Sequence, residues 1–146
     1  MQFKECYQNP FIEERADPYI TLGPDGYYYF TASYPMKSAD DKDGYDRVIL
    51  RRAKDISELA SAEEITIWKV ADTTLTHRFI WAPELHYIAG RWYVFYAGSE
   101  DKENNWAFDC HVLVCDSDDP YTGTWSEKGK FQKREDDDFS FTGFSL

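Results

Sequence analysis

The chain has 146 residues, and its 16 Lys and Arg against 27 Asp and Glu give a formal net charge of −11. This acidic balance argues against nucleic acid and anionic membranes as partners, because both require a basic surface. One domain with a buried core is expected at this length. The aromatic content of 18% is typical of β-structure and of sites where rings stack on ring-shaped ligands.

Alternating apolar runs and turn signals predict a four-stranded meander in the first half of the chain. The strands are expected over residues 18–22, 27–33, 47–53 and 65–70. The sequence GPDG, at residues 23–26, is a hairpin turn. Residues 38–46 are expected to form a polar loop, and residues 54–64 a loop or a short helical turn.

The second half of the chain repeats this order. A strand, an Ala-Gly turn and an aromatic strand are expected over residues 81–99, a further strand over 110–116 and a short one near Trp125. Residues of similar type recur at an offset of 65, namely Pro18 and Pro83, Tyr28 and Tyr93, Phe30 and Phe95, Tyr27 and Trp92, Ala32 and Ala97. This spacing predicts an internal repeat whose aromatic residues form the core of each unit.

A repeated four-stranded antiparallel meander predicts an all-β fold made of β-propeller blades. The first blade is expected over about residues 16–72 and the second over about 80–130, with residues 131–146 leading into a third. A β-sandwich of about eight strands and a barrel are the alternatives, but a sandwich does not require its two halves to repeat.

A propeller needs at least about four blades, so two blades predict the N-terminal part of a larger protein. The repeat offset carries position 17 to position 82 and then to position 147, one residue beyond Leu146. An open blade edge leaves strand groups unpaired. We therefore expect the remaining blades, or a second copy of the chain, to cover this edge.

Cellular location and metal content follow from what the sequence lacks. It has no apolar stretch of the roughly 18 residues that a membrane span needs, and its start, MQFKECYQNP, lacks the apolar core of a signal peptide. We expect a cytoplasmic protein, or a secreted one if the native N-terminus is missing.

No cofactor or metal is expected in this chain, because neither the histidines nor the cysteines show ligand spacing and the loop ADDKDG lacks the first Asp of a calcium loop. Cys6, Cys110 and Cys115 are expected to be free thiols.

Asp17 is the candidate functional residue that the repeat singles out. The offset of 65 places Asp17 and Ala82 at the same point, the start of the innermost strand of each blade. One blade therefore presents a carboxylate to the central channel where its neighbour presents a methyl group. The alternative is that Asp17 satisfies a turn before Pro18, which is a common role for Asp. The repeat alone does not decide between these interpretations.

Four segments stand out, in this order: NPFIEERADPYI, GYYYFTAS, FIWAPELHYIAGRWYVFYAG and DSDDPYTGTW. Together they resemble glycoside hydrolase family 43, a family of five-bladed propellers that includes α-L-arabinofuranosidases and β-xylosidases. The resemblance covers nearly the whole chain, and the second blade is most similar to the arabinofuranosidase branch. It implies hydrolysis with inversion, in which one carboxylate activates water and a carboxylic acid protonates the leaving oxygen.

The resemblance also assigns roles to residues. Asp17 matches the general base, whereas the acid Glu and a pKa-tuning Asp of the family belong to later blades, so the chain alone is expected to be inactive. Trp81 and Glu84 match a Trp-Ala-Pro-acid motif; either they and His86 bind sugar, or Trp81 and Glu84 serve blade packing. A calcium is expected only in a complete propeller.

The predicted function is therefore an inverting α-L-arabinofuranosidase that acts on arabinose-containing plant polysaccharides or oligosaccharides. A β-xylosidase of the same family and a non-catalytic carbohydrate-binding propeller are the alternatives. A protein-interaction scaffold is a third, if the channel of the whole propeller lacks further carboxylates.

Overall fold

The computed structural model describes residues 9–36, 44–72, 78–99 and 107–131. The predictions for Cys6, for most of the loop at 38–46 and for nearly all of the lead-in at 131–146 lie outside these residues. The described part contains eight strands and two short 3₁₀ helices, η1 (Ile56–Ala60) and η2 (Val70–Asp72). No helix in it has the length and apolar character to cross a membrane.

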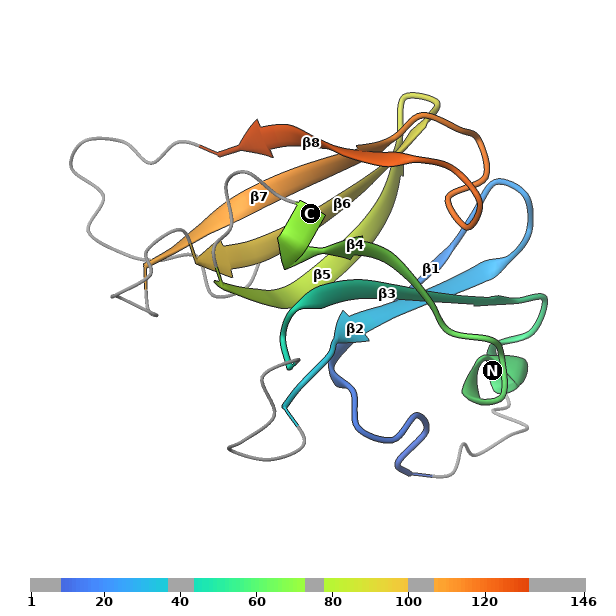
Figure 1. Cartoon of the computed structure of the whole chain (residues 1–146). Helices are drawn as coiled ribbons and strands as arrows, with labels where there is room; N and C mark the ends of the chain where they lie inside the picture. Colours follow the sequence, from blue (N-terminus) through green and yellow to red (C-terminus); the bar gives the residue numbers. More distant parts are fainter. Residues whose placement is uncertain (1–8, 37–43, 73–77, 100–106, 132–146) are drawn as a thin grey trace.

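The strands form two four-stranded antiparallel sheets, each in chain order (Figure 1). The first sheet contains β1 (Ala16–Leu22), β2 (Tyr28–Ser33), β3 (Arg47–Ala53) and β4 (Ile65–Lys69). The second contains β5 (Arg78–Ile88), β6 (Arg91–Ser99), β7 (Phe108–Cys115) and β8 (Trp125–Lys130). Two successive meanders confirm the predicted all-β fold of two blades. The assignment of the whole chain to one catalytic domain with the boundaries given above stays a prediction.

The two sheets pack on one another through a shared apolar core, and β5 lies against β1 and β2. From the first sheet this core receives Tyr29, Val48, Leu50 and Trp68, and from the second Leu85, Trp92, Val94, Tyr96 and Leu113. Trp92, Val94 and Tyr96 are alternate residues of β6, so they point to the same side of the strand. Burying each of these large apolar side chains contributes about 1.5–3 kcal/mol, so this core stabilises the packing of the two sheets.

The opposite face of the first sheet has a smaller core of its own. Phe30, Ala32 and Ile49 lie there with Leu59 of η1, and the segment before β1 covers them through Phe11 and Ile12. Both faces of β2 are therefore covered, which explains why five of its six residues are buried.

The register of the hairpins corrects the predicted repeat. Leu22 pairs with Tyr28, and its equivalent Tyr87 pairs with Trp92. The inner strands are thus related by 65 positions but the second strands by 64, because five residues separate the first pair (23–27) and four the second (88–91). The four equivalences predicted for the second strands, namely Tyr27 with Trp92, Tyr28 with Tyr93, Phe30 with Phe95 and Ala32 with Ala97, are therefore wrong by one residue. A shift of one residue moves a side chain to the other face of a sheet.

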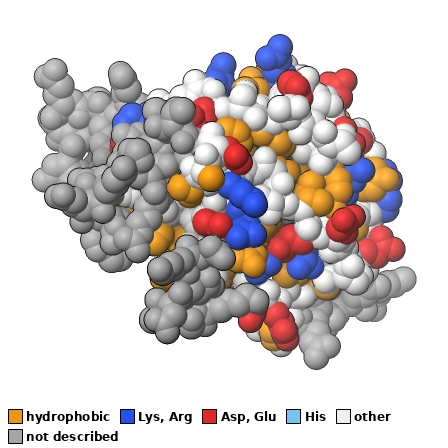
Figure 2. Space-filling model, in the orientation of Figure 1, with side chains coloured by type: hydrophobic (Ala, Val, Ile, Leu, Met, Phe, Trp, Pro, Cys, Tyr) orange, Lys and Arg blue, Asp and Glu red, His pale blue; other side chains and the backbone are white. Residues whose placement is uncertain are grey.

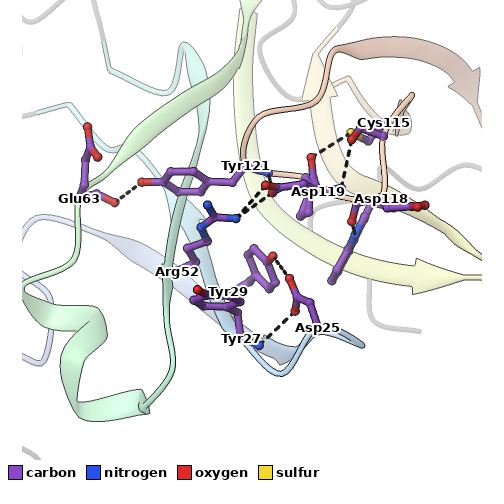
Figure 3. A network of polar contacts seen from close by, with 12 residues as sticks. Asp25, Tyr27, Tyr29, Arg52, Glu63, Cys115, Asp118, Asp119 and Tyr121 are labelled. Atoms are coloured by element: carbon purple, nitrogen blue, oxygen red, sulfur yellow. Dashed lines mark hydrogen bonds and ion pairs between the residues drawn. The ribbon is translucent and has the colours of Figure 1, made fainter.

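A polar network joins the sheets at the end that carries the β1–β2 hairpin (Figure 3). Arg52 of β3 donates to both carboxylate oxygens of Asp119, in the turn before β8, at 2.9 and 3.0 Å. On the first sheet, the Tyr29 hydroxyl donates to Asp25 at 2.6 Å. The Tyr121 hydroxyl, in the turn between β7 and β8, donates to the carbonyl of Glu63 at 2.9 Å. Since Glu63 precedes β4, this hydrogen bond also connects the second sheet to the first.

Two of the predicted free thiols lie on β7. Cys110 and Cys115 are both free and buried, which confirms the prediction for these two residues. Burial, with a smaller effect of the nearby carboxylates of Glu84 and Asp109, raises the pKa of Cys110 to about 12. On the surface shown in Figure 2, acidic and basic side chains of the described residues are interspersed with apolar ones.

Candidate active site

Asp17 lies in a β-bulge at the start of β1. The pairing of β1 with β2 shifts register between Ala16 and Tyr19, and Asp17 has a φ of 50°. Few residues other than Gly adopt this left-handed region, and Asp and Asn tolerate it better than most. The bulge turns the carboxylate out of the ladder, and Asp17 is exposed.

The second sheet repeats this bulge in the middle of β5. The register shifts between Trp81 and Glu84, and Ala82 has a φ of 45°. The same unusual backbone conformation at positions 17 and 82 confirms that Asp17 and Ala82 are equivalent, as the repeat predicted.

The carboxylate of Asp17 is held from the next strand and not by its own turn. Among the described residues its hydrogen bond comes from the hydroxyl of Ser33, at the end of β2, with Oγ 2.9 Å from Oδ2. The same Oγ accepts the backbone N–H of Ala82 at 2.7 Å. A chain of two hydrogen bonds therefore runs from Asp17 through buried Ser33 to the inner strand of the second sheet. The sequence pattern did not identify Ser33.

Glu84 and His86 form a second polar group on β5. Alternate residues of a strand face the same side, and Nε2 of His86 lies 3.0 Å from Oε2 of Glu84. Nδ1 of His86 lies 3.4 Å from the hydroxyl of Tyr19 on β1. Both Glu84 and His86 are largely buried, with side-chain exposures of 13% and 14%.

Tyr19 is a site residue that sequence reasoning missed, although its position, two residues after Asp17 on the same strand, was a usable signal. Its ring lies 5.2 Å from that of His86. Burial, assisted by the negative charge of Glu84, raises the pKa of Tyr19. The phenol is therefore a neutral hydrogen-bonding group at physiological pH.

Trp81 lies in a cluster of aromatic rings. Its indole stacks on the ring of Phe108 with centroids 4.2 Å apart and an interplanar angle of 24°, and Tyr45 meets it edge-on at 5.7 Å. Phe108 is fully buried, so this packing fixes the plane of the indole and covers one of its faces. A sugar would contact Trp81 through the exposed part of this half-buried side chain.

The predicted site residues thus come from the start of β1 and from the middle and second half of β5, two inner strands that lie against one another. Asp17 is connected through Ser33 to Ala82, the residue after Trp81, and His86, which also contacts Glu84, reaches Tyr19. Among the described residues no group of three or more His, Cys, Asp or Glu is arranged to hold a metal ion. The arrangement offers an exposed carboxylate for proton transfer, with a polar cluster and an aromatic plane on the adjacent strand.

Comparison with known proteins adds to this geometry. A family model described as glycosyl hydrolases family 43 matches residues 7–141. An extracellular exo-alpha-(1->5)-L-arabinofuranosidase of Streptomyces avermitilis is 44% identical over 124 residues, which are 85% of this chain and 24% of that protein. Alpha-L-arabinofuranosidase 43 of Humicola insolens is 42% identical over 130 residues, 89% of this chain and 25% of that protein.

Among solved structures, the alpha-L-arabinofuranosidase from Lactobacillus brevis superposes with a TM-score of 0.73 at 40% identity. The match covers 86% of this chain and 39% of that one. The chain spans about a quarter of the length of the two curated relatives, at 24% and 25%.

Proposed function

The chain belongs to glycosyl hydrolase family 43, and on that premise we propose that it supplies the general base of an inverting α-L-arabinofuranosidase. The family acts with inversion, and the relatives at about 40% identity are named arabinofuranosidases. The observation that carries the proposal is Asp17, an exposed carboxylate at a strained bulge that is oriented by a buried hydroxyl.

In this mechanism the carboxylate of Asp17 removes a proton from the water that attacks the anomeric carbon. Oδ2 is engaged by Ser33, so Oδ1 is the atom that we assign to the water. An inverting pair stands about 6.5–9.5 Å apart to admit that water. We place the acid and the pKa-tuning carboxylate outside this chain. On its own the 146-residue chain is then inactive, because each acid or base is typically worth about 10²–10⁴-fold in rate.

We propose that Glu84, His86 and Trp81 bind the sugar. The carboxylate of Glu84 and the imidazole of His86 are polar groups on the strand next to Asp17, and sugar hydroxyls are suitable partners for both. The fixed indole of Trp81 offers a flat surface beside them. These residues orient the substrate relative to Asp17 and transfer no proton themselves.

The outer face of the second sheet supports the proposal that further blades pack on it. Ile88, Tyr93, Phe95, Val112 and Phe131 line an open apolar groove on that face. The equivalent face of the first sheet is covered by the second sheet. We propose that a following blade occupies this groove in the same way.

The test replaces Asp17 in the full-length protein encoded by the gene that carries this sequence. Asp17→Asn keeps the shape of the side chain, and Asp17→Ala introduces the residue that Ala82 shows to be compatible with a bulge of this φ. We expect kcat on an aryl α-L-arabinofuranoside to fall at least about 100-fold. Azide added to Asp17→Ala should restore turnover and give a glycosyl azide of inverted configuration.

Two other results would overturn the catalytic role of Asp17 or the assignment of arabinofuranosides as substrates. Wild-type hydrolysis by Asp17→Asn combined with weaker sugar binding would make the protein a carbohydrate-binding propeller. Hydrolysis of aryl β-xylosides in preference to arabinofuranosides would favour the β-xylosidase alternative.

A further inference from the structure

The hydroxyl of Ser33 connects the Asp17 carboxylate to the second sheet. Ser33 is fully buried at the end of β2, with an exposure of 0%. Its Oγ lies 2.9 Å from Oδ2 of Asp17 and 2.7 Å from the backbone nitrogen of Ala82. Both distances are normal for hydrogen bonds, so the hydroxyl is engaged by two partners on two different strands.

The direction of these two bonds is determined by the chemistry of the groups. A backbone N–H can only donate, so Ala82 donates to Ser33 and occupies one of its lone pairs. The single proton of the hydroxyl is then directed to Oδ2 of Asp17. A hydrogen bond to a carboxylate is stronger than one between neutral groups, and its fixed direction orients the carboxylate.

The second sheet shows that the fold itself does not require this hydroxyl. Ala16 pairs with Ser33 beside the first bulge, and Trp81 pairs with Ala97 beside the second. Ala97 therefore takes the place of Ser33 where Ala82 takes the place of Asp17. The same bulge forms with Ala at both positions, so the hydroxyl and the carboxylate are present together in one sheet and absent together from the other.

We propose that Ser33 is a positioning residue for Asp17. It holds Oδ2 so that Oδ1 is directed at the substrate water, and it ties that orientation to the neighbouring sheet through Ala82. This inference rests on the proposed role of Asp17 as general base. It adds that the orientation of the base depends on the packing of the two sheets.

The test compares Ser33→Ala, Ser33→Cys and Ser33→Thr in the full-length protein. Ser33→Ala should fold, because Ala97 occupies the equivalent place. With the carboxylate no longer oriented, we expect kcat to fall on the order of 10-fold to 100-fold while KM changes less than about 3-fold. Cys is a weak donor and should resemble Ala, whereas Thr keeps the hydroxyl and should restore most of kcat.

Ser99→Ala is the matched control, because Ser99 is also a fully buried serine at the end of its strand, β6. A melting temperature is measured for each variant, so that a loss of kcat is compared at equal stability. Ser99→Ala should keep the wild-type kcat. A loss as large in Ser99→Ala as in Ser33→Ala would show a general effect of packing and overturn the proposal.

A double-mutant cycle separates this proposal from the function on which it rests. If Ser33 acts through Asp17, Ser33→Ala should reduce kcat little further in an Asp17→Asn background. An inactive Asp17→Asn combined with a Ser33→Ala enzyme within 2-fold of wild-type kcat would overturn the positioning role alone. An Asp17→Asn enzyme with wild-type kcat would overturn the general base, and the positioning role with it.

Discussion

Arg52 and Asp119 bind one another across the interface between the two sheets. Nη1 of Arg52 lies 2.9 and 3.0 Å from the two carboxylate oxygens, and the guanidinium lies over the rings of Tyr27 and Tyr121 (Figure 3). Arg52 pairs with Tyr29 near the hairpin end of the first sheet, whereas Asp17 is the second residue of β1 and lies at the other end. The sheets are thus connected at both ends, by Arg52 at one and by Ser33 at the other.

The first prediction is that Arg52→Lys weakens the contact between the sheets. Lys keeps the charge but loses the planar group that stacks between Tyr27 and Tyr121. Because the side chains of Arg52 and Asp119 are partly exposed, we expect the free energy of unfolding to fall by only about 1 kcal/mol. A cycle of Arg52→Lys with Asp119→Asn, measured by urea unfolding, should show a coupling of similar size.

Lys130→Gln is the control for this prediction. Lys130 lies 3.0 Å from Asp109, but that pair connects β8 to β7 within one sheet. Loss of the Lys130–Asp109 ion pair should leave the melting temperature close to that of the wild type. Additive effects of Arg52→Lys and Asp119→Asn would contradict the prediction.

The second prediction concerns acid stability through Glu64. Its carboxylate accepts hydrogen bonds from Nε of Arg15 at 3.1 Å and from Nε of Arg51 at 3.0 Å. Burial alone would raise the pKa of Glu64, but the two arginines outweigh it and the pKa is lowered. A carboxyl whose pKa is lower in the folded state stabilises the fold above its unfolded pKa, about 4.3, and loses this contribution as the pH falls below that value.

Glu64→Gln should therefore be less stable than wild type at pH 7. The difference in the free energy of unfolding should stay constant down to about pH 5 and shrink below about pH 4. Glu58→Gln, at an exposed position in η1, serves as the control and should change the free energy of unfolding at pH 7 less than Glu64→Gln does. Parallel curves for wild type and Glu64→Gln down to pH 3 would contradict the assignment.

The strand pattern predicted most of this fold, and the repeat singled out positions 17 and 82, where the two equivalent bulges lie. The strand over 47–53 has the predicted bounds, and Asp17 and Ala82 adopt the same backbone conformation. The sequence could not show that the first hairpin is one residue longer, because turn length within a Gly-containing loop leaves the pattern of the flanking strands unchanged. Nor could it show that Ser33 binds Asp17 and Ala82 or that Tyr19 contacts His86, because these contacts join different strands and depend on how the two sheets pack.

The third prediction concerns the tautomer of His86. A carboxylate only accepts hydrogen bonds, so Nε2 of His86 donates to Glu84 and Nδ1 of the neutral ring accepts from Tyr19. Nitrogen-15 NMR of the imidazole at a pH where the ring is neutral should show the Nε2–H form. In Tyr19→Phe the same tautomer should persist with a changed Nδ1 shift. A dominant Nδ1–H form would contradict the arrangement, and Glu84→Gln serves as the comparison in which both tautomers become possible.

The last prediction uses the two thiols of β7 to report on the packing of the sheets. Cys110 has an exposure of 0% and a pKa raised to about 12, and Cys115 has an exposure of 2% and lies in the core shared by the sheets. Only the thiolate reacts with iodoacetamide, so neither residue should be alkylated at pH 8 while the fold stays closed.

Alkylation is followed by peptide mass spectrometry in a Cys6→Ser variant, with guanidinium-unfolded protein as the fully reactive reference. Arg52→Lys should speed the labelling of Cys115, because this thiol becomes accessible when the sheets separate at their Arg52–Asp119 end. Labelling of Cys115 at the same rate in wild type and Arg52→Lys would show that Arg52 does not hold the sheets together. Rapid labelling of both cysteines in the wild type would contradict the closed packing of β7 itself.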